Sequence, residues 1–223
     1  MNFDGEEELQ LAKSYPPDII LADIMMPVMD GLEFTKIIKS DRILNHIPVI
    51  LLTARADQNS INEGLKIGAE GYLTKPFNEE EVLSRMDNLI KLKEKLKEKY
   101  GGVVFSEIEK NVDRGQKEFI KELNEIITEN LTNEKFGIPE LTKRLGTNHV
   151  TLNKKIKALT GVTSSNYIKR FRLNVAHKYI AETNLNLNEI SFKIGISDPT
   201  YFTKLFKAEF QILPSKLRED LMP

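Results

Sequence analysis

Short apolar runs alternate with helical patterns through the first 90 residues of the chain. The runs Ile19–Ala22, Val49–Thr53 and Tyr72–Thr74 predict buried strands. Apolar residues at helical spacing predict three helices before and between these strands, over Glu6–Lys13, Leu32–Lys39 and Ser60–Ile67. A fourth helix is predicted to begin after a cap at Asn78. Strands that alternate with helices indicate a parallel sheet with helices on both faces.

Three polar residues fall at the carboxyl ends of these strands. Asp23 follows the first strand, Thr53 closes the second, and Lys75 follows the third. Ligands of parallel sheets bind at that edge. A carboxylate can act as a nucleophile toward phosphorus, a hydroxyl can donate to a phosphoryl oxygen, and an ammonium can neutralise its charge. The pattern therefore predicts a phosphoryl-transfer site.

The second half of the chain contains an internal repeat. The segment from Glu140 aligns with that from Glu189, at an offset of 49 through Gly146 and Gly195 and of 50 from Leu152 onward. Each copy reads as a helix, a glycine turn and a second helix with a cap, at Asn148 or at Asp198 before a proline. The repeat predicts two helix-turn-helix units, at about 138–160 and 187–210, joined by a long helix over Tyr167–Ala181.

Charge is divided along the chain in the same way. The net charge is −1, yet residues 1–90 hold 8 basic and 16 acidic residues, whereas residues 116–223 hold 17 basic and 12 acidic ones. A basic second half favours a nucleic-acid partner for that half alone.

Composition excludes several classes of protein. The chain has no cysteine, so it has no disulfide, no thiolate metal site and no cysteine nucleophile. No apolar run reaches the ~18 residues of a membrane span, and the N-terminus is acidic rather than basic like a signal peptide. We expect a cytoplasmic chain that makes no membrane contact.

The motifs "LADIMMPVMDG", "HIPVILLTA" and "GAEGYLTKPF" closely resemble the response-regulator receiver domain of two-component signalling. The resemblance implies that Asp23 accepts a phosphoryl group from a sensor histidine kinase. It also implies that Thr53, Tyr72 and Lys75 form the switch that responds when Asp23 is phosphorylated. It also implies a Mg²⁺ cofactor, held by Asp23 and by the backbone carbonyl of Met25, and a cis peptide bond before Pro76.

The chain departs from this family at its start. Receivers have five strands, and the first strand carries an acidic pair that supplies further Mg²⁺ ligands, but the first two strands have no counterpart here. The chain is either an N-terminally truncated receiver, which we favour, or a degenerate one. We expect weak Mg²⁺ binding and an exposed edge on the strand that ends at Asp23.

The segments "YIKRFRLNVA", "EISFKIGISDPTYFTKLFK" and "LPSKLRE" resemble the AraC/XylS-type DNA-binding domain. Recognition helices place their N-terminal residues at base edges in the major groove. By spacing, we expect outward side chains that contact double-stranded DNA at these positions: Val150, Thr151, Asn153, Lys154, Thr200, Tyr201, Thr203 and Lys204. Lys157 and Lys207 are expected at phosphates. Gln211 stands where the family usually has a helix-ending glycine, which predicts strain in that turn.

Together these patterns predict an α/β plus all-α protein. An incomplete doubly wound parallel-sheet, flavodoxin-like receiver is expected over residues 1–90, a helical extension and linker over 91–115, and a tandem helix-turn-helix domain over 116–223. The expected function is that of a non-enzymatic, phosphorylation-controlled transcription regulator and candidate homodimer, either on its own or as the C-terminal part of a hybrid sensor and regulator.

Two alternatives to this function remain open. The chain could be a constitutive DNA-binding protein whose degenerate receiver only dimerises. It could also be a haloacid-dehalogenase-type phosphatase with Asp23 as nucleophile. That enzyme class needs a second acid two residues after the first, where this chain has Met25.

Overall fold

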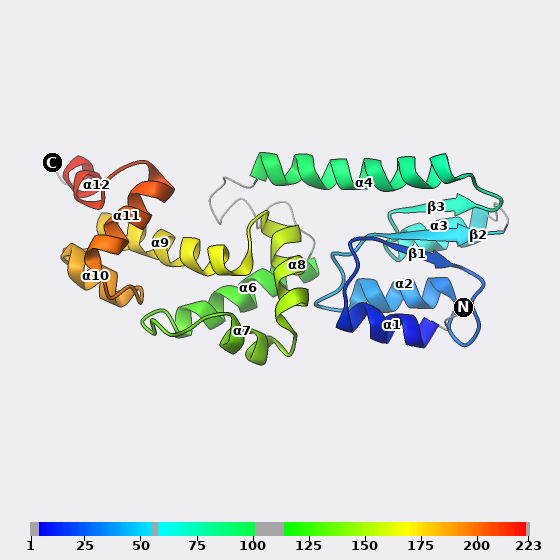
Figure 1. Cartoon of the computed structure of the whole chain (residues 1–223), viewed down its shortest axis with the longest axis horizontal. Coiled ribbons are helices and arrows are strands. Elements are labelled where there is room, and N and C mark those ends of the chain that lie inside the picture. Colours follow the sequence, from blue (N-terminus) through cyan, green and yellow to red (C-terminus); the bar gives the residue numbers. More distant parts are fainter. Residues whose placement is uncertain (1–4, 55–57, 101–113, 222–223) are drawn as a thin grey trace. The chain divides into compact units, whose positions relative to one another are not determined.

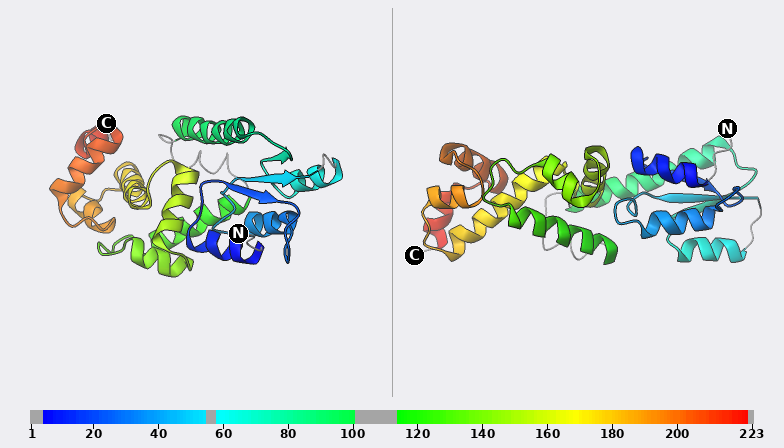
Figure 2. Two further views of the ribbon diagram at one scale, coloured as in Figure 1. Left: turned by 45° about the vertical axis from the view of Figure 1, so that its right-hand side comes forward. Right: turned by 90° about the horizontal axis from the view of Figure 1, so that it is seen from below.

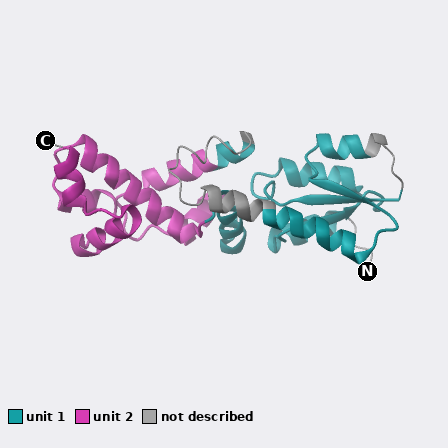
Figure 3. Ribbon diagram, turned by 90° about the horizontal axis from the view of Figure 1, so that it is seen from above, with its two compact units in different colours: residues 1–119, 147–161 teal, residues 120–146, 162–223 magenta. Residues whose placement is uncertain are grey.

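The structure, a computed structural model, describes residues 5–54, 58–100 and 114–221 (Figure 1). The chain divides into two compact units, residues 1–119 with 147–161 and residues 120–146 with 162–223 (Figure 3). The linker part of the extension and linker expected over residues 91–115 falls largely outside the described residues. No helix of the described chain is long and apolar enough to span a membrane.

The receiver-like part of the first unit alternates helices and strands. In chain order its elements are α1 (Gly5–Ser14), β1 (Ile20–Asp23), α2 (Gly31–Ser40), β2 (Val49–Thr53), α3 (Gln58–Lys66), β3 (Gly71–Thr74) and α4 (Glu79–Tyr100). All three strands and all four helices of this part agree with the sequence prediction to within two residues at their N-terminal ends. The glycine pair after Tyr100 coincides with the end of α4.

The three strands form one parallel sheet in the order β1-β2-β3. Ile20 aligns with Val49 across the first pair, and Thr53 aligns with Thr74 across the second. The strand that ends at Asp23 is therefore an edge strand in the described sheet, as the sequence predicted. Parallel order also brings the carboxyl ends of all three strands to one side of the sheet.

Helices α1 and α2 cover one face of the sheet, and α4 lies over the other face (Figures 1 and 2). On the first face the core joins Phe34 and Ile38 of α2 to Ala22, Val49 and further side chains of the strands and α1. Ala22 and Val49 are fully buried, because each lies in a strand and faces these helices. This core holds in place the carboxyl-terminal edge of the sheet, where the polar residues lie.

The rest of the described chain is helical. Its elements are α6 (Arg114–Glu129), α7 (Ile138–Leu145), α8 (His149–Thr160), α9 (Ser164–Glu182), α10 (Leu187–Lys193), α11 (Pro199–Phe210) and α12 (Pro214–Leu221). The predicted repeat is confirmed in its local geometry. Gly146 and Gly195 both have left-handed backbones, with φ of 63° and 68°, and the helices that follow them are 12 residues long.

The long helix α9 organises the second unit, where α10, α11 and α12 lie against it (Figure 1). Phe202 and Phe206 of α11 are fully buried in a core shared with Leu173 and Ala176 of α9. Gly195 is required in the turn between α10 and α11, because a Cβ there would lie 2.5 Å from the carbonyl oxygen of Leu131. Tertiary packing therefore holds α11 in a fixed orientation on α9.

Candidate functional site

Asp23 and Lys75 form an ion pair at the carboxyl end of the sheet. The Lys75 ammonium donates to Oδ2 of Asp23, and the backbone N–H of Met25 donates to its Oδ1 at 3.1 Å. The two side chains are 31% and 40% exposed, so a phosphoryl donor in solution can reach both. The carboxylate is thus oriented at both oxygens and remains open on its solvent side.

The loop after Asp23 is shaped by the Asp30-Gly31 dipeptide. Asp30 caps α2 by accepting from the backbone N–H of Glu33 at 2.8 Å. Gly31 lies so close to the end of β1 that a Cβ on it would be 2.4 Å from the carbonyl oxygen of Asp23. Gly31 is a site residue that was not predicted from the sequence, although the Asp-Gly pair at the start of a helix was the available signal.

Thr53 and Tyr72 lie on the strands beside Asp23. Thr53 is 6% exposed at the end of β2, and its carbonyl accepts from the backbone N–H of Lys75 at 2.7 Å. The peptide bond after Lys75 is cis, as the resemblance implied. Tyr72 is half-buried in β3, with the Arg85 guanidinium 5.7 Å from its ring centroid. The backbone thus ties Thr53 directly to the residue that pairs with Asp23.

The residues around Asp23 do not fit a strong Mg²⁺ site. Magnesium requires near-octahedral oxygen coordination. The Asp23 carboxylate is already engaged at both oxygens, because Lys75 binds Oδ2 and the Met25 backbone N–H donates to Oδ1. No group of three or more acidic, histidine or cysteine side chains within the described ranges could hold a metal ion. The receiver family typically uses Mg²⁺, and the described residues by themselves supply only part of such a donor set.

The helix α11 presents an exposed polar face. Asp198 caps it, accepting from the backbone N–H groups of Thr200 at 2.8 Å and Tyr201 at 3.1 Å. Thr200, Lys204 and Lys207 are exposed, and the Tyr201 ring is 52% exposed. Thr203 is half-buried, and its hydroxyl donates to the carbonyl of Pro199 at 2.9 Å. Four of the five predicted positions on this helix are therefore accessible.

The helix α8 is less open than its sequence predicted. Val150 is 54% exposed and Lys157 is exposed, whereas Asn153 and Lys154 are half-buried. The Lys154 ammonium donates to the backbone oxygen of Pro16 at 2.7 Å and lies 3.3 Å from a carboxylate oxygen of Asp18.

The prediction that Thr151 points outward is wrong, because its side chain is only 2% exposed. Both its backbone N–H and its hydroxyl donate to Oδ1 of Asn148, at 2.9 and 3.0 Å. Thr151 thus completes the helix cap, which draws its side chain back toward the first turn.

Several arginines of the basic half form intramolecular contacts that stabilise the fold. The Arg172 guanidinium donates to the carbonyls of Gly195 at 2.8 Å and Asn133 at 2.7 Å. Burial lowers the pKa of this guanidinium, and the charge of Glu134 opposes that effect. Arg170 forms an ion pair with Glu209 of α11 at 2.5 Å.

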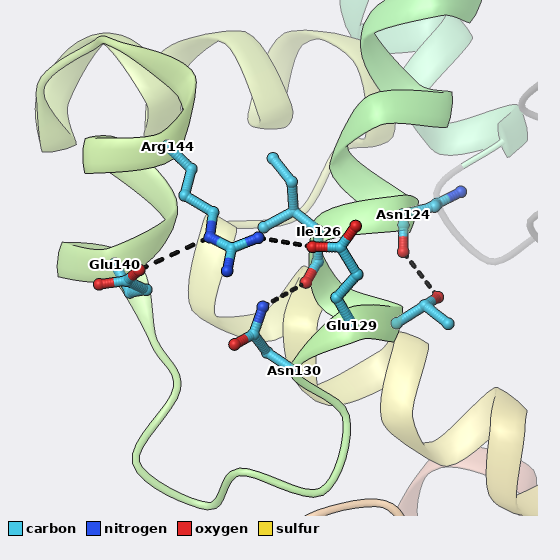
Figure 4. Close-up of polar contacts among 7 residues, drawn as sticks. Asn124, Ile126, Glu129, Asn130, Glu140 and Arg144 are labelled. Carbon is cyan, nitrogen blue, oxygen red and sulfur yellow. Dashed lines mark hydrogen bonds and ion pairs between the residues drawn. The ribbon is translucent and has the colours of Figure 1, made fainter.

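Arg144 links two helices of the second unit. Its guanidinium bridges Glu129 of α6 at 2.6 Å and Glu140 of α7 at 3.6 Å (Figure 4). Asn130, at the end of α6, donates to the carbonyl of Ile126 at 2.8 Å in the same view. The basic charge of this half is therefore only partly available to a ligand.

Comparisons with known proteins support the domain predicted for each half of the chain. Residues 3–87 match the family model of the response regulator receiver domain, and residues 141–220 match that of a helix-turn-helix domain. The chain thus combines a receiver domain with a helix-turn-helix domain of the AraC type. Both resemblances inferred from the sequence are confirmed.

Relatives show the two domains together and apart. Histidine kinase P4 of Formosa agariphila is 34% identical over 216 residues, which is 96% of this chain but 16% of that protein. The alkaline phosphatase synthesis transcriptional regulatory protein PhoP of Bacillus subtilis is 36% identical over 91 residues, 41% of this chain and 37% of PhoP. The chain therefore spans well under half the length of either relative.

Solved structures resemble each domain in turn. The C-terminal domain of the response regulator yesN from Fusobacterium nucleatum is 27% identical, with a TM-score of 0.41, covering 44% of this chain and 96% of that domain. The receiver domain of the Francisella response regulator 1452 is 42% identical, with a TM-score of 0.37, covering 40% of this chain and 72% of that one.

Proposed function

We propose that this chain is the output part of a two-component phosphorelay, in which phosphorylation of Asp23 controls DNA binding by the helix-turn-helix domain. One observation carries the proposal: an oriented, solvent-accessible carboxylate paired with Lys75 stands on the same chain as the exposed face of α11. The receiver domain spans about residues 1–90, the connector 91–115 and the DNA-binding domain 116–223.

The chemistry at Asp23 follows from its partners. A carboxylate oxygen of Asp23 attacks the phosphorus of a phosphohistidine on a sensor kinase, the P–N bond breaks, and the imidazole leaves. Lys75 then balances the charge of the new acyl phosphate, and the Thr53 hydroxyl binds one of its oxygens. Since the described residues alone supply only part of a Mg²⁺ donor set, we assign no step to a metal ion.

DNA reading is assigned mainly to α11. Lys204 can donate to guanine, and the Tyr201 ring can contact a thymine methyl group in the major groove. Lys207 lies one helical turn further on and suits a phosphate. The second helix-turn-helix unit is favoured over the first because Tyr201, Lys204 and Lys207 are exposed, whereas the Lys154 ammonium is already bound.

The experiment is selection of bound duplexes from randomised DNA with the full chain, followed by titration of the selected sequence at several salt concentrations. We expect specific binding that weakens as salt rises. In a form of the chain extended at its N-terminus by a strand that carries an acidic pair, a difference in affinity between the Asp23-phosphorylated and unphosphorylated forms supports phosphorylation control. Equal affinities would instead favour the constitutive DNA-binding protein, and the absence of salt-dependent binding would refute both.

A further inference from the structure

The turn between α10 and α11 is attached to the loop between α6 and α7, which is far from it in the sequence. The Arg172 guanidinium of α9 donates one N–H to the carbonyl of Gly195 at 2.8 Å and another to that of Asn133 at 2.7 Å. At the surface, the Ser197 hydroxyl donates to Oε1 of Glu134 at 2.7 Å. Two contacts, one buried and one exposed, therefore join the turn to the same short loop.

The loop is itself held in place, so it can anchor the turn. The backbone N–H of Asn133 donates to the carbonyl of Asn130 at 3.1 Å, and that of Phe136 donates to the carbonyl of Asn133 at 3.1 Å. Leu131 and Phe136 are both buried. Leu131 also shares a hydrophobic core with Ile194, at the end of α10. The loop thus combines its own hydrogen bonds with burial of its apolar side chains.

The equivalent turn of the first helix-turn-helix unit is packed differently. Gly146 and Gly195 hold the same place in the repeat, and both have a left-handed backbone. A Cβ on Gly195 would lie 2.5 Å from the carbonyl oxygen of Leu131 and 2.9 Å from a guanidinium nitrogen of Arg172. A Cβ on Gly146 would meet no atom of the described chain within 4 Å. The two turns share their local geometry, but of the two glycines in the described structure only Gly195 lies tightly against distant segments.

Arg172 fixes this geometry at a cost in free energy. The residue is 7% exposed, and its Nε–H is buried with no acceptor among the described residues. Burial of an ionised group with one donor unbonded is unfavourable. The planar guanidinium nevertheless holds two carbonyls in a fixed relative position, which the point charge of a lysine on a flexible stem cannot do. The gain from this arrangement is therefore a defined orientation of the turn.

We propose that Arg172 is a positioning residue for DNA reading: by joining Gly195 to Asn133, it fixes the start of α11 and sets how precisely that helix meets base edges. This inference rests on the proposed function, in which α11 reads DNA in the major groove. The turn runs directly into Asp198, the cap of α11, and Tyr201 lies in the first turn of that helix, where recognition helices contact bases. Hydrogen bonds to bases discriminate only in the correct geometry, so a displaced turn costs sequence preference.

The test uses Arg172→Lys in the full chain, because lysine keeps the positive charge but cannot bridge both carbonyls. Arg144→Lys is the matched control, since Arg144 bridges α6 and α7 rather than the turn before α11. Fluorescence anisotropy gives the dissociation constants for the selected duplex and for a random duplex of equal length. We expect Arg172→Lys to lower the ratio of the random to the selected constant by about tenfold, comparable to loss of one base contact. Arg144→Lys should leave that ratio unchanged.

The exposed contact gives a second and milder test, which decides the matter if Arg172→Lys does not fold. Ser197→Ala, Glu134→Ala and the double variant each remove the same hydrogen bond. All three should therefore lower the ratio equally, by about threefold. The ratio is the appropriate measure because the charge lost in Glu134→Ala changes affinity for both duplexes alike.

A purely structural role for Arg172 predicts a different result. The variant would then contain less active protein by stoichiometric titration, or have a lower urea midpoint, while its folded molecules would keep the native ratio and the native salt slope. An unchanged ratio in folded Arg172→Lys would overturn the proposal, as would an equal loss in Arg144→Lys or unchanged ratios in both Ser197→Ala and Glu134→Ala. These outcomes, with specific binding by the native chain, refute the positioning role alone. A native chain without salt-dependent DNA binding refutes the proposed function and this inference with it.

Discussion

Gly31, at the start of α2, lies against the backbone of Asp23, so that a Cβ on Gly31 would stand 2.4 Å from the Asp23 carbonyl oxygen and 3.0 Å from the Cα of Ile24. Both contacts are with backbone, which cannot turn aside as a flexible side chain can. The backbone N–H of Gly31 also donates to the Ile24 carbonyl at 3.1 Å. The loop after the phosphoacceptor thus depends on a residue without a side chain.

Replacement of Gly31 by alanine should therefore be costly. We expect Gly31→Ala to lower the free energy of unfolding by about 1–3 kcal/mol, the range for an overpacked site, measured as a shift of the urea midpoint. Gly71→Ala is the matched control, since a Cβ there meets its nearest atom, of Arg85, at 3.8 Å. Equal stability of the two variants would show that α2 can move away from β1 at little cost.

Phosphorylation of the isolated chain should be inefficient. We expect little acyl phosphate on Asp23 after incubation with acetyl phosphate and Mg²⁺, because the described residues offer too few metal ligands. Intact-mass spectrometry checks this directly. Fusion of a strand that carries an acidic pair ahead of α1 should restore phosphorylation, and Asp23→Asn should then abolish it. Strong phosphorylation of the unmodified chain would contradict the expected ligand deficit.

The two recognition helices should respond differently to loss of a lysine. Lys204→Ala should reduce affinity for the selected DNA sequence by about 1–3 kcal/mol if Lys204 meets a base, and Lys154→Ala should have a smaller effect because its ammonium is already bound. Lys207→Ala should weaken binding to all sequences alike and lower the salt slope by about one unit. Fluorescence anisotropy titrations at several salt concentrations measure both quantities.

Lys121 on α6 provides a control for the lysine variants. Lys121 is 77% exposed and pairs only loosely with Glu125, at 3.8 Å, so Lys121→Ala should leave DNA affinity nearly unchanged. If Lys204→Ala and Lys207→Ala have identical effects on sequence preference, α11 has not been placed correctly in the groove.

The end of α11 offers a test of backbone strain. Gln211 adopts φ of 59° and ψ of 16°, and its side-chain Nε2 donates to the carbonyl of Ala208 at 3.0 Å. A left-handed backbone costs a non-glycine residue roughly 1–2 kcal/mol, so Gln211→Gly should raise the free energy of unfolding by about 1 kcal/mol. Gln211→Ala keeps the strain and loses the hydrogen bond, and it should be less stable than the native chain. A glycine variant no more stable than the native chain would show that this hydrogen bond offsets the strain.

The local sequence pattern was sufficient to predict many structural features of this protein. The strand ends at Asp23 and Lys75, the caps at Asn148 and Asp198 and the repeated glycine turns were all predicted from sequence, because each depends on neighbours within a few residues. Parallel strand order then required the polar ends to meet on one side of the sheet.

Tertiary structure decided what local pattern could not. Helical spacing predicted an outward Lys154, but its ammonium donates to the backbone oxygen of Pro16, so a contact with a segment far away in the sequence determined its exposure. The need for glycine at positions 31 and 195 arises from backbone brought close by folding, at Asp23 and Leu131 respectively. Sequence therefore determined which residues could carry the chemistry, while the close approach of distant segments determined which of them are free to act, because steric contact and hydrogen-bond competition exist only in the folded chain.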